Sequence, residues 1–376
     1  MTDEARLDSP ADLEAADPEG MLRAVASGAA QVREAVAFSR EAGVGHLAQE
    51  DLPRSVVVLG MGGSGIAGDL LAAVAGPTCP VPVLSVRGHV LPTWVGAADL
   101  VVAVSCSGTT EETLAALDEA VRRGCRILAV GADGSPLHQL ATRGRGLFVP
   151  VTGGRQPRAS VFALSTPLVV AGDALGLLTC PPDEVESTAV LLEQLATRYQ
   201  PGAETALNPA KSLALDLLGA LPVVWGSSQV AGVAAYRFAC QLNENAKVPA
   251  TWGVLPEAGH NQVVPFDGPF ARATDQDLFR DRAEEAEPTG TRMRVVLLRD
   301  VVEHPRVGRR AEVVAGLAEG RSLPLSEAAA EGDSAFARIA SLFALADWTT
   351  VYLGLLEGID PTPVRPIDEL KAALSR

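Results

Sequence analysis

Short runs rich in β-branched residues alternate with alanine-rich helical stretches along the chain, and this alternation limits the fold more than any other feature. Five such runs precede the middle of the chain, at 55–59, 82–86, 100–104, 126–130 and 146–150. Two more follow after a gap, at 222–226 and 293–298. Strands that alternate with helices form parallel sheets built from βαβ units. The pattern therefore predicts an α/β protein with doubly wound parallel sheets and flanking helices.

The length of the chain, 376 residues, predicts two domains, because a single core rarely grows beyond about 250–300 residues. The segment Pro222-Val-Val-Trp-Gly226 and its following serines echo Val56-Val-Val-Leu-Gly60, which indicates an internal duplication. Four parts are predicted: a helical extension at 1–50, a first sheet domain at 51–182, connecting helices at 183–220, and a second sheet domain with C-terminal helices at 221–376.

Local patterns predict structure outside the strands as well. Residues 18–43 carry apolar side chains at helical spacing and end at glycine, which predicts one or two helices. A long alanine-rich helix is predicted from about 334 to 357, and a short one at 366–374. The charged, proline-bearing stretch 266–291 is predicted to be an exposed loop.

Charge and composition exclude several classes of partner. The formal net charge of −15 opposes binding to nucleic acid or anionic lipid, because both are polyanions. The N-terminus is polar and acidic, and no uninterrupted run of about 18 apolar residues occurs, so neither export nor a membrane span is expected. The five cysteines and five histidines show no metal-ligand spacing. We expect a cytoplasmic protein with reduced thiols and no bound metal.

A glycine-rich turn, Gly60-Met-Gly62-Gly63-Ser64-Gly65, joins the first predicted strand to a helix. Glycine lets the backbone approach a ligand closely, and a helix N-terminus offers unpaired N–H donors, so the turn suits a phosphate group. The pattern also fits a dinucleotide-binding turn, but such a site needs an acidic residue about 20 positions later. The next predicted strand ends at Arg87 instead, which leaves an NADP-dependent oxidoreductase as an alternative.

The predicted strand at 100–104 leads into a turn that carries four hydroxyl side chains: Ser105, Ser107, Thr109 and Thr110. Simple N-capping of the next helix would explain one hydroxyl. Four hydroxyls together with the free amides of a helix N-terminus can wrap a phosphate monoester. The turn therefore predicts a phosphate cradle, while Glu111 and Glu112 after it favour the first helical turn through the helix dipole.

These turns and several later blocks resemble the bifunctional phosphoglucose/phosphomannose isomerase family, whose members are built from sugar isomerase (SIS) domains. The two turns, GMGGSGIAGD at 60–69 and SCSGTTEET at 105–113, are similar to the phosphate-binding loops of that family. The later blocks are Pro157-Arg158-Ala159, Asn243-Glu-Asn-Ala-Lys247, Pro256-Glu257 with His260-Asn261, and Asp360-Pro-Thr-Pro363 with Leu370-Lys371. The resemblance spans about residue 55 to the C-terminus and implies two flavodoxin-like SIS domains.

The resemblance also implies a reaction: glucose 6-phosphate, and mannose 6-phosphate, would interconvert with fructose 6-phosphate through a cis-enediol, without metal or cofactor. This chemistry needs a base, a group that opens the sugar ring, and a charge that stabilises the enediolate. By resemblance, Glu244 is the base, His260 opens the ring and Arg158 stabilises the enediolate. The resemblance places Lys371 beside the substrate, and it implies a homodimer in which His260 enters the site of the partner subunit.

The phosphate of the substrate would be held by the two turns, through Gly62, Gly63, Ser64, Ser105, Ser107, Thr109 and Thr110. The patterns themselves agree with two of the catalytic roles. Glu244 falls near the C-terminal end of a predicted helix, where the helix dipole disfavours a carboxylate, and His260 falls in a predicted loop.

Two positions depart from the family pattern. Thr109 replaces the usual asparagine of the SGNT turn, and Gln262 replaces the glutamate that often follows the His-Asn pair. The second change removes a negative charge beside His260, which predicts lower activity. A sugar-phosphate-binding SIS protein that keeps the cradle without catalytic activity, as SIS domains in regulators do, is a second alternative.

Overall fold

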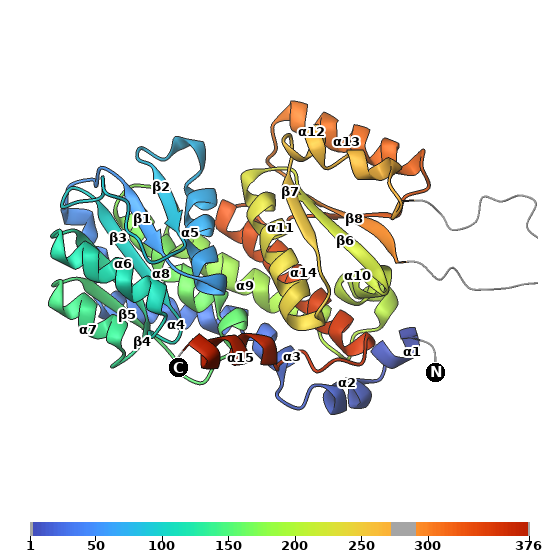
Figure 1. Cartoon of the computed structure of the whole chain (residues 1–376), viewed down its shortest axis with the longest axis horizontal. Coiled ribbons are helices and arrows are strands. Elements are labelled where there is room, and N and C mark those ends of the chain that lie inside the picture. Colours follow the sequence, from blue (N-terminus) through green and yellow to red (C-terminus); the bar gives the residue numbers. More distant parts are fainter. Residues whose placement is uncertain (1–2, 272–290, 375–376) are drawn as a thin grey trace, which may run out of the picture. The chain divides into compact units, whose positions relative to one another are not determined.

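The computed structural model describes residues 3–271 and 291–374. The chain divides into two compact units, each built around one parallel sheet (Figure 1). The first-sheet unit contains Arg23–Ala196 and Glu331–Ala344, and the second-sheet unit contains the described residues of Met1–Leu22, Thr197–Ala330 and Leu345–Arg376. Each unit thus includes a segment that is distant in sequence from the strands of its sheet. The boundaries between the four predicted parts of the chain, at residues 50, 182 and 220, remain predictions.

The first sheet has five parallel strands in the order β2-β1-β3-β4-β5, which is the flavodoxin-like order. The strands are β1 (Val56–Leu59), β2 (Val83–Val86), β3 (Leu100–Ser105), β4 (Arg126–Ala132) and β5 (Leu147–Val151). Val56 pairs with Val83 on one side and with Leu100 on the other. Because β1 and β3 are adjacent and parallel, the turns that follow them emerge at the same edge of the sheet.

Helices cover both faces of this sheet (Figure 1). Val58 and Val102 pack in one core cluster with residues of α5 (Gly62–Ala75) and α8 (Val161–Ala174). Their sequence neighbours Val57 and Val101 pack in another cluster with residues of α6 (Glu111–Arg122) and α7 (Pro136–Arg143). Successive strand residues point to opposite faces, so continuous apolar runs are what a sheet buried on both faces requires.

The second sheet has four parallel strands in the order β7-β6-β8-β9. The strands are β6 (Ala220–Gly226), β7 (Thr251–Val254), β8 (Arg292–Arg299) and β9 (Leu325–Ala329). The central pair, β6 and β8, matches the two predicted runs. The edge strands β7 and β9 were not predicted, because edge strands are less buried and these two lack a continuous apolar run.

Helices also cover the second sheet. α11 (Gln229–Gln241) contacts β6 and β7, while α12 (Ala258–Asn261) and α13 (Pro305–Glu319) contribute residues to a core cluster with Val223, Trp225 and Val295. Strand order 2-1-3-4 recurs in both sheets, which agrees with the predicted duplication. The predicted fold class, two doubly wound parallel-sheet domains with flanking helices, is confirmed.

The remaining α-helices are α1 (Asp3–Leu7), α2 (Pro10–Ala16), α3 (Met21–Ala26), α4 (Gly28–Glu41), α9 (Pro182–Tyr199), α10 (Pro209–Leu217), α14 (Ala335–Leu356) and α15 (Arg365–Leu374). Helices α3, α4, α14 and α15 confirm the helical predictions for those segments. By length and composition α14 could cross a membrane, but its most apolar window is entirely buried, as in a core helix of a globular protein. Most of the predicted exposed loop at 266–291 lies outside the described residues.

Candidate active site

The two turns predicted to bind phosphate, at 60–65 and 105–110 in the first-sheet unit, lie side by side at the carboxyl edge of β1 and β3. The Ser64 hydroxyl accepts a hydrogen bond from the backbone N–H of Cys106 at 3.3 Å, which joins the first turn to the second. Gly62 has a positive φ of 51°, a conformation that favours glycine, and it opens α5. The structure therefore brings together all the predicted phosphate residues: Gly62, Gly63, Ser64, Ser105, Ser107, Thr109 and Thr110.

The four hydroxyls of the second turn are paired with each other. Ser105 is completely buried; its hydroxyl shares a hydrogen bond with Thr110 at 2.9 Å and accepts one from the N–H of Gly108 at 3.1 Å. Ser107 and Thr109 are exposed, and the Thr109 hydroxyl donates to the Ser107 hydroxyl at 3.0 Å. In this arrangement Ser105 stabilises the turn, whereas Ser107 and Thr109 face solvent. A direct contact from Ser105 to phosphate stays a prediction.

The N-terminus of α6 completes this arrangement. Thr110 is the N-cap residue, but its side chain does not cap the helix and pairs with Ser105 instead. The first-turn amides of a helix lack intrahelical partners, and in α6 no N-cap side chain takes them. A phosphate at this turn would therefore meet exposed hydroxyls and helix-terminal N–H donors together.

Arg158 belongs to the same unit and lies next to the first turn. It sits on the single 3-10 turn η3 (Pro157–Ala159), and only 4% of the residue is exposed. A β-carbon built at Gly63 would lie 3.7 Å from the Arg158 Cα, so the η3 backbone packs directly against the glycine turn. A guanidinium keeps its charge at every working pH, so the loop that packs against the glycine turn carries a permanent cation.

Helix α4 supports the loop that carries Arg158. The Gln31 side chain donates to the carbonyl of Ala159 at 2.7 Å. Glu34 accepts hydrogen bonds from Thr152, at 2.7 Å, and from Arg155. These contacts hold both ends of the loop, and sequence patterns did not indicate them because the partners are more than 100 residues apart.

Arg87, the residue on which the NADP alternative depended, is engaged within the protein. Its guanidinium forms an ion pair with Asp69 of α5 and donates to the carbonyl of Gly65 at 3.3 Å. Asp69 also accepts from Ser85 at 2.7 Å. These contacts account for an arginine at the end of β2 without a nucleotide.

The other predicted catalytic residues, Glu244, His260 and Lys371, belong to the second-sheet unit. Glu244 is half-buried in a π-helical segment, η5 (Leu242–Ala246), which continues α11. π-Helical turns are rare and often mark functional positions. Lys247, which directly follows η5, joins this segment to the chain after α14. Its ammonium donates to the carbonyls of Glu244, at 2.7 Å, and Pro361, at 3.0 Å.

His260 is exposed and lies on the one-turn helix α12, so the predicted loop conformation is wrong at this point. Gln262, the residue that departs from the family pattern, accepts from the indole N–H of Trp225 and donates to the carbonyl of Trp252. Lys371 is exposed on α15.

Glu244 and His260 of one chain lie at opposite edges of the second sheet. α11 starts at the carboxyl edge of β6 and runs back along the sheet, and η5 with Glu244 follows its far end. β7 then returns to the carboxyl edge, where α12 carries His260. A helix of 13 residues spans about 20 Å, so this return separates the two residues widely.

The turn after β6 is similar in sequence to the turn after β1, but its serines are hydrogen-bonded to an aspartate. Ser228 donates to the buried Asp300 at 2.8 Å and caps α11 by accepting from the N–H of Ala231. The N–H of Asp300 donates to the Ser227 hydroxyl at 2.9 Å. Asp300 therefore engages both serine hydroxyls of this turn, which does not repeat the arrangement of the first-sheet turns.

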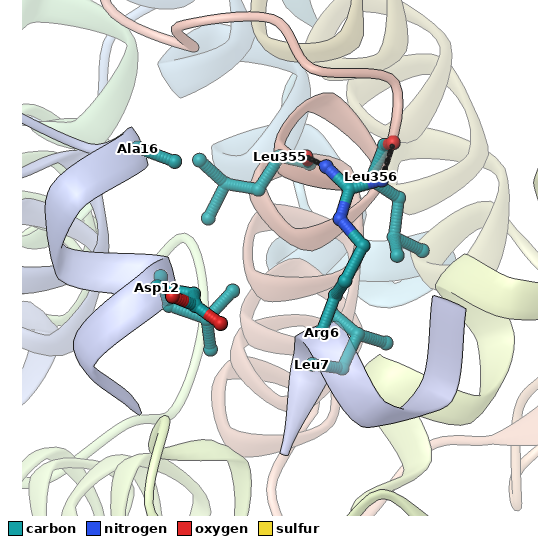
Figure 2. A pocket seen from close by; sticks show the side chains of 7 residues that line it. Arg6, Leu7, Asp12, Ala16, Leu355 and Leu356 are labelled. Carbon is teal, nitrogen blue, oxygen red and sulfur yellow. Dashed lines mark hydrogen bonds between the residues drawn. The ribbon is translucent and has the colours of Figure 1, made fainter. Parts of the chain in front are cut away.

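A small cavity of about 50 Å³ near the N-terminus does not resemble an active site (Figure 2). Its one cationic side chain, Arg6, donates to the carbonyls of Leu355 and Leu356 at the end of α14, as the dashed lines in Figure 2 show. Among residues 3–271 and 291–374, no group of three or more His, Cys, Asp and Glu side chains could hold a metal ion.

Comparison with known proteins agrees with these features. Residues 206–374 match the family model described as the bacterial phospho-glucose isomerase C-terminal SIS domain. The chain is 34% identical over 345 residues to a bifunctional phosphoglucose/phosphomannose isomerase of Caldicellulosiruptor bescii, covering 92% of this chain and 96% of that protein. It is 31% identical to the protein of the same name from Aquifex aeolicus, covering 86% of this chain and 91% of that protein.

Among solved structures, a hypothetical protein from Thermus thermophilus has a similar fold, with a TM-score of 0.69 and 16% identity over 96% of this chain and 94% of that one. At this identity the likeness concerns the fold alone. The sequence relatives carry the assignment, because their similarity extends over both sheets. This chain belongs to the bifunctional phosphoglucose/phosphomannose isomerase family.

Proposed function

We propose that this chain is an aldose–ketose isomerase that interconverts glucose 6-phosphate and mannose 6-phosphate with fructose 6-phosphate. Family membership supports the reaction class. The observation that carries the proposal is the pair of joined turns, which present exposed hydroxyls and a helix N-terminus beside the buried cation of Arg158. An acidic chain of net charge −15 needs such local donors to hold an anionic sugar phosphate.

The proposed reaction moves one proton between neighbouring carbons. Glu244 removes the proton from C2 of the open-chain aldose, and the electrons of that C–H bond form the C1–C2 double bond while the C1 carbonyl becomes an enediolate oxygen. The hydroxyl proton of the intermediate then passes from O2 to O1. Glu244 returns its proton to C1, and the electrons on O2 form the C2 carbonyl of the ketose. Arg158 stabilises the negative oxygen of the intermediate, and Lys371 assists at the substrate.

His260 opens the sugar ring by proton transfer to and from the ring oxygen and the anomeric hydroxyl. We propose that it acts in the site of a partner subunit within a homodimer. The opposite placement of Glu244 and His260 on the second sheet supports this arrangement, since the two residues of one chain are held far apart. The proposal needs no metal or cofactor and places the enzyme in the cytoplasm.

The direct test offers fructose 6-phosphate to the purified chain and detects glucose 6-phosphate and mannose 6-phosphate separately. We expect both aldoses to form, and the rate to be unchanged after dialysis against a chelator. Loss of activity on chelation, with recovery on adding a divalent cation, would contradict the metal-free mechanism alone. Binding of fructose 6-phosphate without any product would instead favour the non-catalytic alternative, and binding of NADP would favour the oxidoreductase.

A further inference from the structure

The short segment that carries His260 is attached to the second sheet through one buried tryptophan. Trp225, in β6, is completely buried, and its indole N–H donates to the side-chain oxygen of Gln262 at 2.6 Å. The same indole stacks on Phe266, with ring centroids 5.6 Å apart and planes 11° apart. Gln262 and Phe266 follow His260 by two and six residues, so both anchors lie just after the histidine.

The Gln262 amide makes a second bond that a carboxylate could not make. Its nitrogen donates to the backbone carbonyl of Trp252 in β7 at 3.2 Å. An ionised glutamate could accept from Trp225 but would present a second acceptor to the Trp252 carbonyl. A β-carbon at Gly253 would lie 2.5 Å from the Gln262 oxygen, so the glycine leaves the space that the amide occupies. Glutamine at 262 therefore provides the acceptor that the Trp225 indole needs and the donor that the Trp252 carbonyl needs.

The helix that bears His260 depends on such anchors. α12 has only four residues, and a helix this short is not stable by itself. His260 is exposed, whereas Ala258 before it is buried in the core cluster that contains Trp225. The orientation of the histidine is thus set by Ala258 on one side and by Gln262 and Phe266 on the other.

We infer that Gln262 is a positioning residue, which holds His260 in place for ring opening by joining α12 to Trp225 and Trp252. This inference rests on the proposed function and goes beyond it. It also revises the expectation from sequence that glutamine at 262 only removes a helpful charge, because the amide binds the indole of one tryptophan and the backbone of another.

Three variants test the inference: Gln262→Met, Trp225→Phe and Trp252→Phe. The first keeps the length of the side chain without its hydrogen bonds. The second keeps an aromatic ring for Phe266 but removes the indole N–H. Trp252→Phe is the matched control, because the hydrogen bond from Gln262 goes to the backbone carbonyl at that position, which the substitution keeps. Circular dichroism of each variant establishes that it is folded.

We expect Gln262→Met and Trp225→Phe each to lower kcat about tenfold on fructose 6-phosphate, with KM within about twofold of the parent. Trp252→Phe should stay within about twofold in both constants. The Gln262→Met/Trp225→Phe double variant should lose no more than the worse single variant, because both changes remove the same bond.

Parental kcat for Gln262→Met, or losses that multiply in the double variant, would overturn the inference. If Gln262→Met does not fold, Trp225→Phe decides alone, and parental kcat in that variant counts against the inference. An inactive parent protein would instead contradict the proposed function, so the two failures are distinguishable.

Discussion

Lysine is rare in this chain, and two of its three lysines bind several backbone carbonyls at once with an ammonium group. The chain has 31 basic residues, of which only Lys211, Lys247 and Lys371 are lysines. The completely buried Lys211 ammonium donates to the carbonyls of Leu7, Pro201 and Ala203 at 2.6–2.8 Å. An ammonium is compact and has three donors, whereas a guanidinium is a larger planar fork.

Burial lowers the pKa of Lys211, and the carboxylate of Asp8, 3.7 Å away, opposes that change. Lys211→Met should therefore destabilise the protein by about 3 kcal/mol, because three carbonyls would lose a shared donor and Asp8 its cation. Urea unfolding of the variant and the parent measures the difference. Arg306→Met, at an exposed position of α13, is the control and should stay within about 0.5 kcal/mol of the parent. Equal stability of Lys211→Met and the parent would show that this contact set is not stabilising.

At the scale of elements, the π-helical segment η5 and helix α14 determine where Glu244 lies. Asn245, next to Glu244, donates to the Thr350 hydroxyl at 3.0 Å. One turn and two turns earlier, Gln241 and Arg237 of α11 both donate to the buried Asp347 of α14. Hydrogen bonds to α14 are therefore made both by α11 and by η5.

Gly354 marks the closest approach of α14 to this segment. A β-carbon there would lie 2.8 Å from the backbone oxygen of Asn245, so Gly354→Ala must displace one of the two backbones. We expect a loss of about 1–3 kcal/mol in the free energy of unfolding and a lower kcat, because Glu244 moves with η5.

Gly316→Ala is the control for that substitution. It makes the same change in α13, where a β-carbon meets nothing within 4 Å, and alanine there should be neutral or stabilising by up to about 1 kcal/mol. Calorimetric melting and steady-state kinetics of both variants give the two quantities. A Gly354→Ala protein with parental kcat would mean that η5 tolerates the displacement without moving Glu244.

These elements also show what sequence could and could not predict. The seven apolar strands were predictable because a sheet buried on both faces requires continuous apolar runs. The glycine-rich and hydroxyl-rich turns were recognisable from local residue types. β7, β9 and the π-helical geometry of η5 were not, because they depend on pairing and packing with distant chain. The role of Gln262 could not be predicted either, since its partners, Trp225 and Trp252, become neighbours only in the folded sheet.

For the whole molecule, the two sheets share a strand order but differ at the corresponding turn. In the turn after β1 the Ser64 hydroxyl accepts from the N–H of Cys106, whereas in the turn after β6 Ser227 and Ser228 are hydrogen-bonded to Asp300. Glu244 and His260, the proposed base and ring-opening group, both belong to the second-sheet unit and lie at opposite edges of its sheet.

The proposed homodimer makes a specific prediction for mixed subunits. His260→Ala and Glu244→Gln proteins should each be inactive, but co-expressed subunits should regain about a quarter of parental activity. Half of randomly mixed dimers contain both variants, and one of the two sites in such a dimer has an intact Glu244 and an intact His260. If tagged mixed dimers form and remain inactive, His260 does not act across the interface.

The most direct measurement of the central claim follows both isomerisation and proton exchange in heavy water by nuclear magnetic resonance. Glucose 6-phosphate should give fructose 6-phosphate with deuterium entering at the reacting carbons, because a carboxylate base exchanges its proton with solvent. Glu244→Gln should lower both rates by about 10²–10⁴-fold, while Glu319→Gln, an exposed residue of α13, leaves them unchanged. Isomerisation and exchange by Glu244→Gln at the parental rates would contradict the account.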